Sequence, residues 1–215
     1  MKLDKRAGEI VNRLDKAYPE AHQELNFSNA FELLIATILA AQCTDVKVNQ
    51  VTETLFKKYP DPAAFAAADI SNLEQEMRII TFYRNKAKGI LKTCTILVDE
   101  HNSEVPNTVE ELVKLPYVGR KTANIVLSNA MGIPAIGVDT HTLRVPNRLG
   151  IADTKNSDKM EAQLCELLPQ EKWHRANILI QWHGRYTCTA KKPKCGACVV
   201  FNLCEWEEKI TFKEG

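Results

Sequence analysis

One stretch of this 215-residue sequence decides the fold: Leu115-Pro116-Tyr117-Val118-Gly119-Arg120-Lys121, at the centre of residues 108–131. Thr108 and Glu111, which precede it, fit a capping box, in which a hydroxyl and a carboxylate satisfy free N–H groups at a helix start. The pattern predicts a helix that ends at Pro116, a tight turn, and a second helix that ends before Gly132. Residues 108–131 are therefore predicted to form a helix–turn–helix unit.

Helical patterns also dominate the rest of the chain. Ser28 is a good N-cap. The apolar residues after it follow the spacing of one buried helix face: Phe31, Leu34, Ile35, Ile38 and Leu39. Asp45 is placed to cap a second helix that reaches Lys58, and Ser71 with Glu74 fits another capping box. Strand-like alternation is nearly absent, so the sequence predicts an all-α fold of roughly ten helices.

The helices divide into two predicted lobes. Residues 22–133, with the helix–turn–helix unit at about 108–131, are expected to form one helical, barrel-like domain. Residues 1–21 and 134–215 are expected to form the other. A ligand cleft between the lobes is the default expectation.

The overall charge says nothing about a polyanionic partner, because 28 basic and 27 acidic residues leave a formal net charge of +1. Affinity for a nucleic acid must come from local patches. Two basic runs without an acid are candidates: Arg84, Lys86, Lys88 and Lys92, and Arg185, Lys191, Lys192 and Lys194. Each run also fits a solvated helix face or loop.

The N-terminal segment lacks the features of a secretory signal. Residues 1–14 carry charges throughout and have no apolar core, and no apolar run in the sequence approaches about 18 residues. These features predict an intracellular protein.

Four of the seven cysteines lie within 17 residues, in the pattern C-x6-C-x2-C-x5-C: Cys188, Cys195, Cys198 and Cys204. In a reducing compartment this group predicts one metal centre rather than disulfides. Thiolate-only ligation and a spacing unlike a zinc ribbon favour an iron–sulfur cluster, although spacing alone leaves zinc open. We expect ligation to order residues 189–194 and to turn their lysines, Lys191 among them, into a phosphate-facing surface.

The turn before the second helix of the unit is a predicted anion site. Free backbone N–H groups at the helix start, from Val118 to Arg120, lie beside Gly119, which lets a phosphate approach closely. This arrangement suits a helix-hairpin-helix that grips the DNA backbone. The alternative is an ordinary αα-hairpin with basic surface residues.

Lys121 lies within one turn of that phosphate site, where an anchored nucleotide would present its sugar. A neutral amine at this place can attack an electrophilic anomeric carbon and form a Schiff base. Asp139 is expected to cap a helix from Thr140 to Leu149 and to supply a carboxylate close to Lys121. The plainer interpretations are an exposed helix lysine and a helix cap alone.

These residues resemble the endonuclease III family of DNA glycosylases over almost the whole chain. The matching motifs are residues 31–36 and 41–45, Tyr83-Arg84-Asn85-Lys86-Ala87, residues 115–124, Val138-Asp139-Thr140-His141 and the four clustered cysteines. The resemblance implies the helix-hairpin-helix glycosylase fold, with a cleft for DNA and the target base between the lobes. It also implies that Lys121 is the Schiff-base nucleophile, that Asp139 is the catalytic carboxylate, and that the four cysteines hold a [4Fe–4S] cluster.

The implied activity is that of a DNA glycosylase and AP lyase, which removes oxidised or ring-saturated pyrimidines from duplex DNA and then nicks the strand 3′ to the abasic site by β-elimination. Such an enzyme flips the target nucleotide out of the stack. The resemblance implies that Gln42 fills the gap that the flipped nucleotide leaves in the base stack, and that Phe82 is an apolar wedge between neighbouring bases. The expected DNA-contacting residues are Gln42, Phe82, Arg84, Lys86, Val118, Gly119, Arg120, His141 and Lys191.

The resemblance also sets expectations for partners and location. We expect a monomer that acts on duplex DNA with a damaged base or an abasic site and that has no membrane partner. Its expected location is the cytoplasm of a prokaryote, in association with the nucleoid through DNA.

Two residues depart from what the family and the helix pattern favour. The family hairpin normally has Gly where this chain has Tyr117, and a type II turn after Pro116 requires a positive φ there, at about 1–3 kcal/mol of strain. A type I turn would avoid the strain but aim the following amides elsewhere. Pro146 lies inside the helix predicted after Asp139 and is expected to bend it. Tyr117 is therefore expected to alter how the hairpin holds DNA.

Two other functions fit parts of the sequence. A mismatch adenine glycosylase shares the fold, the aspartate and the cluster, but it typically lacks a lysine at the position of Lys121 and has an additional C-terminal domain. This sequence ends eleven residues after Cys204. A non-catalytic helix-hairpin-helix DNA-binding protein is supported only by Tyr117. Lys121 separates the three functions, because only the glycosylase and lyase uses it as a nucleophile.

Overall fold

The computed structural model describes residues 1–213, and these residues form two compact units. Residues 23–133 form one unit, and residues 1–22 together with those from Pro134 onward form the other. The described residues contain eleven α-helices, four short 3₁₀ helices and no strand, so the predicted all-α fold is confirmed. No helix in that part of the chain is both long and apolar enough to cross a membrane.

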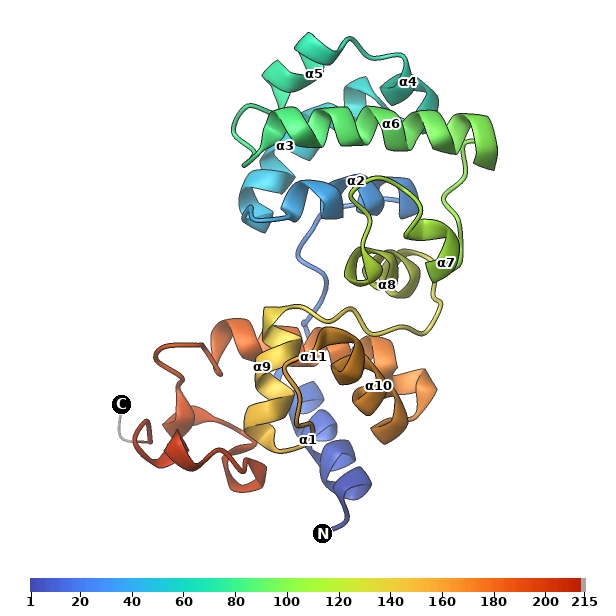
Figure 1. The fold of residues 1–215 in the computed structure, drawn as a ribbon. Helices are drawn as coiled ribbons and strands as arrows, with labels where there is room; N and C mark the ends of the chain where they lie inside the picture. The colour runs from blue at the N-terminus through green and yellow to red at the C-terminus, as the bar shows by residue number, and fades with distance from the viewer. Residues whose placement is uncertain (214–215) are drawn as a thin grey trace. The chain divides into compact units, whose positions relative to one another are not determined.

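The unit of residues 23–133 is built around the longest helix, α6 (Tyr83–His101). The other helices are α2 (Ala30–Ala40), α3 (Asp45–Lys58), α4 (Pro62–Ala66), α5 (Ile70–Glu76), α7 (Val109–Leu112) and α8 (Arg120–Ala130). Helices α4 and α5 pack along α6, which also contacts α2, and α2 in turn packs on α3 and α8 (Figure 1). Their core includes Leu34, Ile35, Phe65 and Ile90, all of which are fully buried.

The second unit combines both ends of the chain. It contains α1 (Leu3–Ala17), α9 (Thr140–Leu149), α10 (Ser157–Leu167), η1 (Gln170–Lys172), α11 (Trp173–Tyr186), η2 (Cys195–Ala197), η3 (Phe201–Leu203) and η4 (Glu207–Ile210). Helix α11 packs on α1 and α9 (Figure 1). Ile10 and Leu14 of α1 share one core with Val145, Leu164 and Leu179. The N-terminal helix therefore buries its apolar face in the C-terminal part of the chain, which explains why this unit is discontinuous in sequence.

Three predicted helix caps are wrong by one or two residues. Helix α2 is capped by Asn29 rather than Ser28, and α5 is capped by Asp69 rather than Ser71. Each of these side chains accepts a hydrogen bond from the N–H three residues further on. Asp45 is the first residue of α3 and not its cap. Asn and Asp compete well with Ser for this role, so the choice depends on where the backbone turns into the helix.

The helix–turn–helix unit is present, but its first helix is a single turn. Thr108 caps α7 as predicted and accepts the N–H of Glu111 at 3.3 Å. The helix ends at Leu112 and does not reach Pro116. Beyond it, the N–H groups of Lys114 and Leu115 donate to carbonyls three residues earlier, so the chain continues in tight turns up to the proline. Helix α8 ends at Ala130, and Gly132 follows with a φ of +68°, as the C-terminal signal predicted.

Candidate functional site

The turn between α7 and α8 has the features of a type II turn. The N–H of Val118 donates to the carbonyl of Leu115 at 3.2 Å, and Tyr117 between them has a φ of +63°. The strain expected at Tyr117 is therefore present. Its side chain is 57% exposed, and its ring lies against α6 at Gly89, where any Cβ atom would collide with it.

The start of α8 is open to a ligand. Gly119 is its N-cap and has no side chain to cap the first turn, and a Cβ atom placed there would meet nothing within 4 Å. The first helical hydrogen bond runs from the N–H of Ala123 to the carbonyl of Gly119. The amides before Ala123 therefore form a suitable cradle for a phosphate, and Arg120 and Lys121 beside them are exposed.

Val118 does not fit the DNA contact expected of it. Its side chain is buried, with 5% exposed, and its N–H is already used in the turn. An apolar side chain between two helices packs into the core, so Val118 holds the hairpin together instead.

Asp139 caps α9 in the second unit, as predicted. One carboxylate oxygen, Oδ1, accepts the N–H of His141 at 2.9 Å and the N–H of Thr142 at 2.7 Å. The two hydrogen bonds of the cap do not use Oδ2. A half-buried carboxylate with one free oxygen can both hold the helix and stabilise a nearby positive charge.

His141 follows the cap and is half-buried. Burial lowers the pKa of His141, and the positive charges of Arg144 and Arg185 act in the same direction, against the opposing charge of Asp139. Its Nδ1 lies 3.2 Å from Nη2 of Arg144. His141 is therefore suited to a DNA contact as a neutral hydrogen-bonding group rather than as a cation.

Two arginines of α9 hold the loop that presents Lys191, and the sequence reasoning missed both. Arg144 donates to the carbonyl of Cys188, while Arg148 donates to the carbonyls of Thr189 and Ala190 at 2.8 and 3.0 Å. Lys191 itself is exposed. The four-residue spacing of the arginines places both on one face of α9, which was the available signal.

All four clustered cysteines line one small cavity. Arg148 Nη1 lies 3.6 Å from Sγ of Cys188, and His183 Nε2 lies 3.7 Å from Sγ of Cys198. Burial raises the pKa of Cys198 to about 11, and ligation to a metal would favour the thiolate form of this sulfur. Among residues 1–213 no group of three or more His, Cys, Asp or Glu is arranged to hold a single metal ion. Four thiols around one cavity fit an iron–sulfur cluster.

The three remaining cysteines differ in burial. Cys94 is fully buried, as expected of a core residue, and burial raises the pKa of its thiol to about 12. Cys43 and Cys165 are only half-buried.

Gln42 and Phe82 occupy exposed turns of the unit formed by residues 23–133. Both hold a left-handed backbone conformation, with φ values of 54° and 59°. Phe82 is 58% exposed, which suits a wedge and not a core residue. Arg84 is also exposed, with its Nε 3.8 Å from a carboxylate oxygen of Glu74.

Lys86 does not fit the direct DNA contact expected of it. Only 3% of the residue is exposed, and its Nζ donates to the carbonyls of Leu39 and Ala41 at 2.8 and 2.6 Å. Burial lowers the pKa of Lys86. Its ammonium therefore binds the C-terminal end of α2, where free carbonyls attract a cation.

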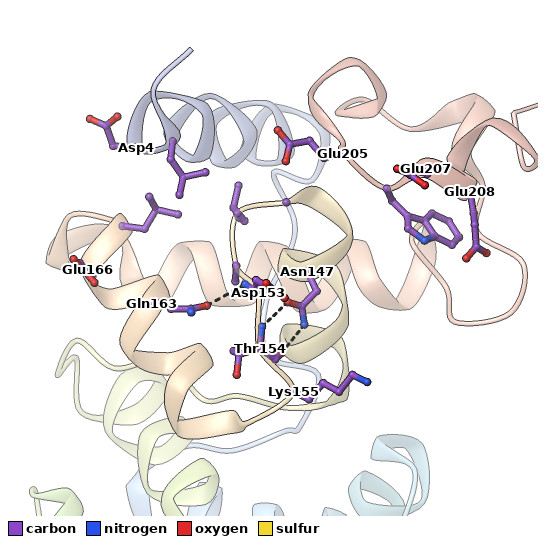
Figure 2. A pocket seen from close by; sticks show the side chains of 16 residues that line it. Asp4, Asn147, Asp153, Thr154, Lys155, Gln163, Glu166, Glu205, Glu207 and Glu208 are labelled. Atoms are coloured by element: carbon purple, nitrogen blue, oxygen red, sulfur yellow. Dashed lines mark hydrogen bonds between the residues drawn. The ribbon is translucent and has the colours of Figure 1, made fainter.

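A large cavity in the second unit is unsuited to DNA. It has a volume of roughly 1410 Å³, and its lining contains six acidic residues but only one basic residue, Lys155. Figure 2 shows Glu205, Glu207 and Glu208 near one side of it and Asp4 and Glu166 near another. Carboxylates in this number repel a phosphate backbone.

Comparison with known proteins assigns the family. Residues 35–170 match the model of the HhH-GPD superfamily base excision DNA repair proteins, and residues 188–204 match the iron–sulfur binding domain of endonuclease III. The chain is 46% identical over 202 residues to endonuclease III of Escherichia coli (strain K12), covering 94% of this chain and 96% of that one. The chain belongs to the endonuclease III family.

Other relatives and solved structures support the same assignment. The endonuclease III of Bacillus subtilis (strain 168) is 44% identical, over 93% of this chain and 91% of its own. A solved structure of a trapped endonuclease III–DNA covalent intermediate matches with a TM-score of 0.92 at 44% identity, over 98% of this chain and 100% of that one. A thermostable thymine-DNA glycosylase, at 22% identity and a TM-score of 0.87 over 95% and 98% of the two chains, shares the fold. The cofactor of this endonuclease III family member is a [4Fe–4S] cluster.

Proposed function

We propose that this chain is a bifunctional DNA glycosylase and AP lyase that removes oxidised or ring-saturated pyrimidines from duplex DNA. The observation that supports this proposal most directly is the exposed Lys121 in the first turn of α8, two residues after the open N-cap at Gly119. A phosphate bound to the amides of this turn brings the adjacent sugar within reach of the amine.

The proposed reaction begins with attack by the neutral Nζ of Lys121 on C1′ of the flipped nucleotide. The new C–N bond replaces the glycosidic bond, and the base leaves with the bonding electron pair and takes up a proton. Opening of the sugar ring at O4′ gives a protonated Schiff base between Lys121 and C1′. Asp139 is the proposed carboxylate that stabilises the positive charge developing on the sugar.

The Schiff base makes the C2′ proton acidic, and its removal allows β-elimination. The C3′–O3′ bond breaks, so the strand is cut on the 3′ side of the lesion and the phosphate leaves with the electron pair. Water then hydrolyses the imine and restores the free amine of Lys121. Gln42 and Phe82 are the proposed residues that occupy the hole and wedge the stack during this sequence.

The [4Fe–4S] cluster has a proposed structural role. Held by Cys188, Cys195, Cys198 and Cys204, it would fix the chain on both sides of Lys191. The same loop is anchored by arginines of α9, the helix that begins at Asp139. The proposed catalytic carboxylate and the proposed phosphate-binding lysine would then share one support.

Trapping with borohydride tests this function. A duplex with one abasic site is incubated with the protein and borohydride, which reduces a Schiff base to a stable amine. We expect a covalent protein–DNA adduct that is absent in Lys121→Ala and unchanged in Lys57→Ala, an exposed lysine on α3 whose partner is Glu53. No adduct in the unmutated protein, together with release of adenine from a separate mismatched duplex, would indicate a mismatch adenine glycosylase instead. Binding without excision or an adduct would indicate a non-catalytic DNA-binding protein.

We also propose that the protein acts as a monomer in the cytoplasm, in association with the nucleoid. The proposed reaction needs only one chain, since Lys121, Asp139 and the four cysteines all belong to it. Sedimentation of the free protein and of its complex with a short abasic-site duplex tests the monomer, and a dimer in both would overturn it.

A further inference from the structure

Three exposed turns in the unit of residues 23–133 hold a strained backbone. Gln42, Phe82 and Tyr117 have φ values of 54°, 59° and 63°, although none of them is glycine. A non-glycine residue in this region is strained, and the conformation persists only where the surrounding structure holds it. Each of these three turns must therefore have a support.

One face of α6 supplies that support. Phe82 immediately precedes the helix, and Lys86, Gly89 and Thr93 follow at intervals of four, three and four residues, which places them on the same side. Lys86 binds the end of α2, directly before Gln42. Gly89 and Thr93 meet the hairpin turn: the ring of Tyr117 lies on Gly89, and Thr93 Oγ1 donates to the carbonyl of Pro116 at 3.1 Å.

Lys86 acts on the backbone of Gln42 directly. The carbonyl of Ala41, which accepts from Lys86 at 2.6 Å, belongs to the peptide group that joins Ala41 to Gln42. Fixing that peptide plane fixes one side of the bond about which φ of Gln42 is measured. The second acceptor, the carbonyl of Leu39, lies in the last turn of α2, so the same ammonium ties the turn to the helix before it.

Because Lys86 is buried, its ammonium depends on the two carbonyls for hydrogen bonds. An ammonium with 3% of its residue exposed has lost most of its hydration, and two carbonyls at a helix C-terminus replace it. A lysine that only binds a DNA phosphate would lie on the surface, as Arg84 does two residues earlier. Of these two neighbouring cationic residues, Lys86 is therefore buried and Arg84 is exposed.

We propose that Lys86 is a positioning residue that holds the turn of Gln42 in register with Phe82 and Tyr117, so that the three turns meet DNA as one preformed surface. The proposal rests on the proposed function, in which Gln42 enters the hole left by the flipped base. It replaces the expected phosphate contact of Lys86 with an indirect role.

The test compares Lys86→Met with the unmutated protein in single-turnover excision and in DNA binding. A misplaced Gln42 turn lowers the excision rate, and we expect a fall of about tenfold or more, because small errors in position cost up to about 100-fold. The dissociation constant for an abasic-site duplex should change by less than about threefold, and its dependence on salt should keep the same slope. A lysine that contacts phosphate would instead lower that slope by about one when removed.

Matched variants separate positioning from general damage. Lys57→Met removes an exposed lysine of the same unit and should leave all three readouts unchanged. Lys86→Arg keeps donors for the two carbonyls and should restore most of the excision rate. Adding Lys86→Met to Gln42→Ala should cost little further rate, because the turn no longer has a side chain to place.

A spectroscopic readout reports the turn without chemistry. With 2-aminopurine opposite a stable abasic analogue, insertion of Gln42 displaces the orphaned base and raises its fluorescence, and Lys86→Met should weaken this rise. If Lys86→Met does not fold, Lys86→Gln, whose shorter side chain cannot reach both carbonyls, takes its place with the same expected pattern. A smaller salt slope, or an unchanged excision rate and fluorescence, overturns the proposal. If the unmutated protein forms no borohydride adduct, the proposed function is overturned instead.

Discussion

At Tyr117 a bulky residue holds a backbone conformation that favours glycine, and its ring rests on a glycine of another helix. Its φ is +63°, and no Cβ atom could be added at Gly89 without meeting the ring. Gly89 lies inside α6, where glycine is less favourable than alanine by roughly 0.5–1 kcal/mol. The two residues are therefore coupled, since the unusual residue in the turn requires the unfavourable residue in the helix.

This coupling predicts that one substitution changes sign with its background. Gly89→Ala should lower the free energy of unfolding when Tyr117 is present, because of the collision with its ring. In the Tyr117→Gly background the same substitution should raise the free energy of unfolding by about 0.5–1 kcal/mol.

Tyr117→Gly alone should also tighten binding to abasic-site DNA, because it relieves the strain in the turn that positions the α8 amides. Urea unfolding of the four proteins and a titration at fixed salt check both effects; equal effects of Gly89→Ala in the two backgrounds would contradict the coupling.

At the scale of the element, helix α9 has two roles. It begins at the proposed catalytic carboxylate, and its arginines support the loop after Cys188. Asp139 begins the helix, and Arg144 and Arg148 bind the loop that follows Cys188. The helix continues through Pro146 to Leu149. The bend expected at Pro146 remains a prediction.

The two roles of Asp139 can be separated by two substitutions. Asp139→Asn keeps an oxygen that accepts the N–H groups of His141 and Thr142, so stability should change by a few tenths of a kcal/mol at most. Asp139→Ala removes the cap and should cost about 0.5–2 kcal/mol. Base excision should fall at least about 100-fold in both, because both lose the negative charge. Thermal unfolding and single-turnover excision provide the measurements, and full activity in Asp139→Asn would leave the residue as a cap alone.

At the scale of the whole molecule, the segment after α11 depends on its cluster. The described part of this segment, residues 187–213, contains only 3₁₀ helices of three or four residues. Helices this short have no stability of their own. Arg148, whose guanidinium stacks on Trp206 at 3.9 Å, ties the segment to α9, but four thiols that line one cavity remain at its centre.

Removal of the iron should therefore loosen this segment and leave the other unit intact. After loss of the visible charge-transfer absorption, amide hydrogen exchange should rise across residues 188–210 and stay slow in α6, whose core contacts include helices of its own unit. Affinity for abasic-site DNA should fall, because the loop of Lys191 is no longer fixed. Unchanged exchange in residues 188–210 of the iron-free protein would assign the ordering to the arginines of α9 instead.

Much of this arrangement could be predicted because it depends on near neighbours in the sequence. Thr108 caps α7 through Glu111, three residues away, and Asp139 caps α9 through the N–H groups two and three residues further on. The errors at Ser28 and Ser71 come from the same short range, where a second good cap stood one or two residues away. Local signals thus find a helix more reliably than its first residue.

Local patterns were enough to predict the all-α fold, the hairpin before Lys121 and the group of four cysteines, since each follows from spacing within a few turns of chain. The inward direction of Lys86, the burial of Val118 and the contact of the Tyr117 ring with Gly89 depend instead on tertiary packing. The carbonyls that bind Lys86 lie 45 and 47 residues before it in the chain. Whether a charged side chain faces water or the interior is a balance between hydration and such distant partners, and no local pattern records where those partners will be.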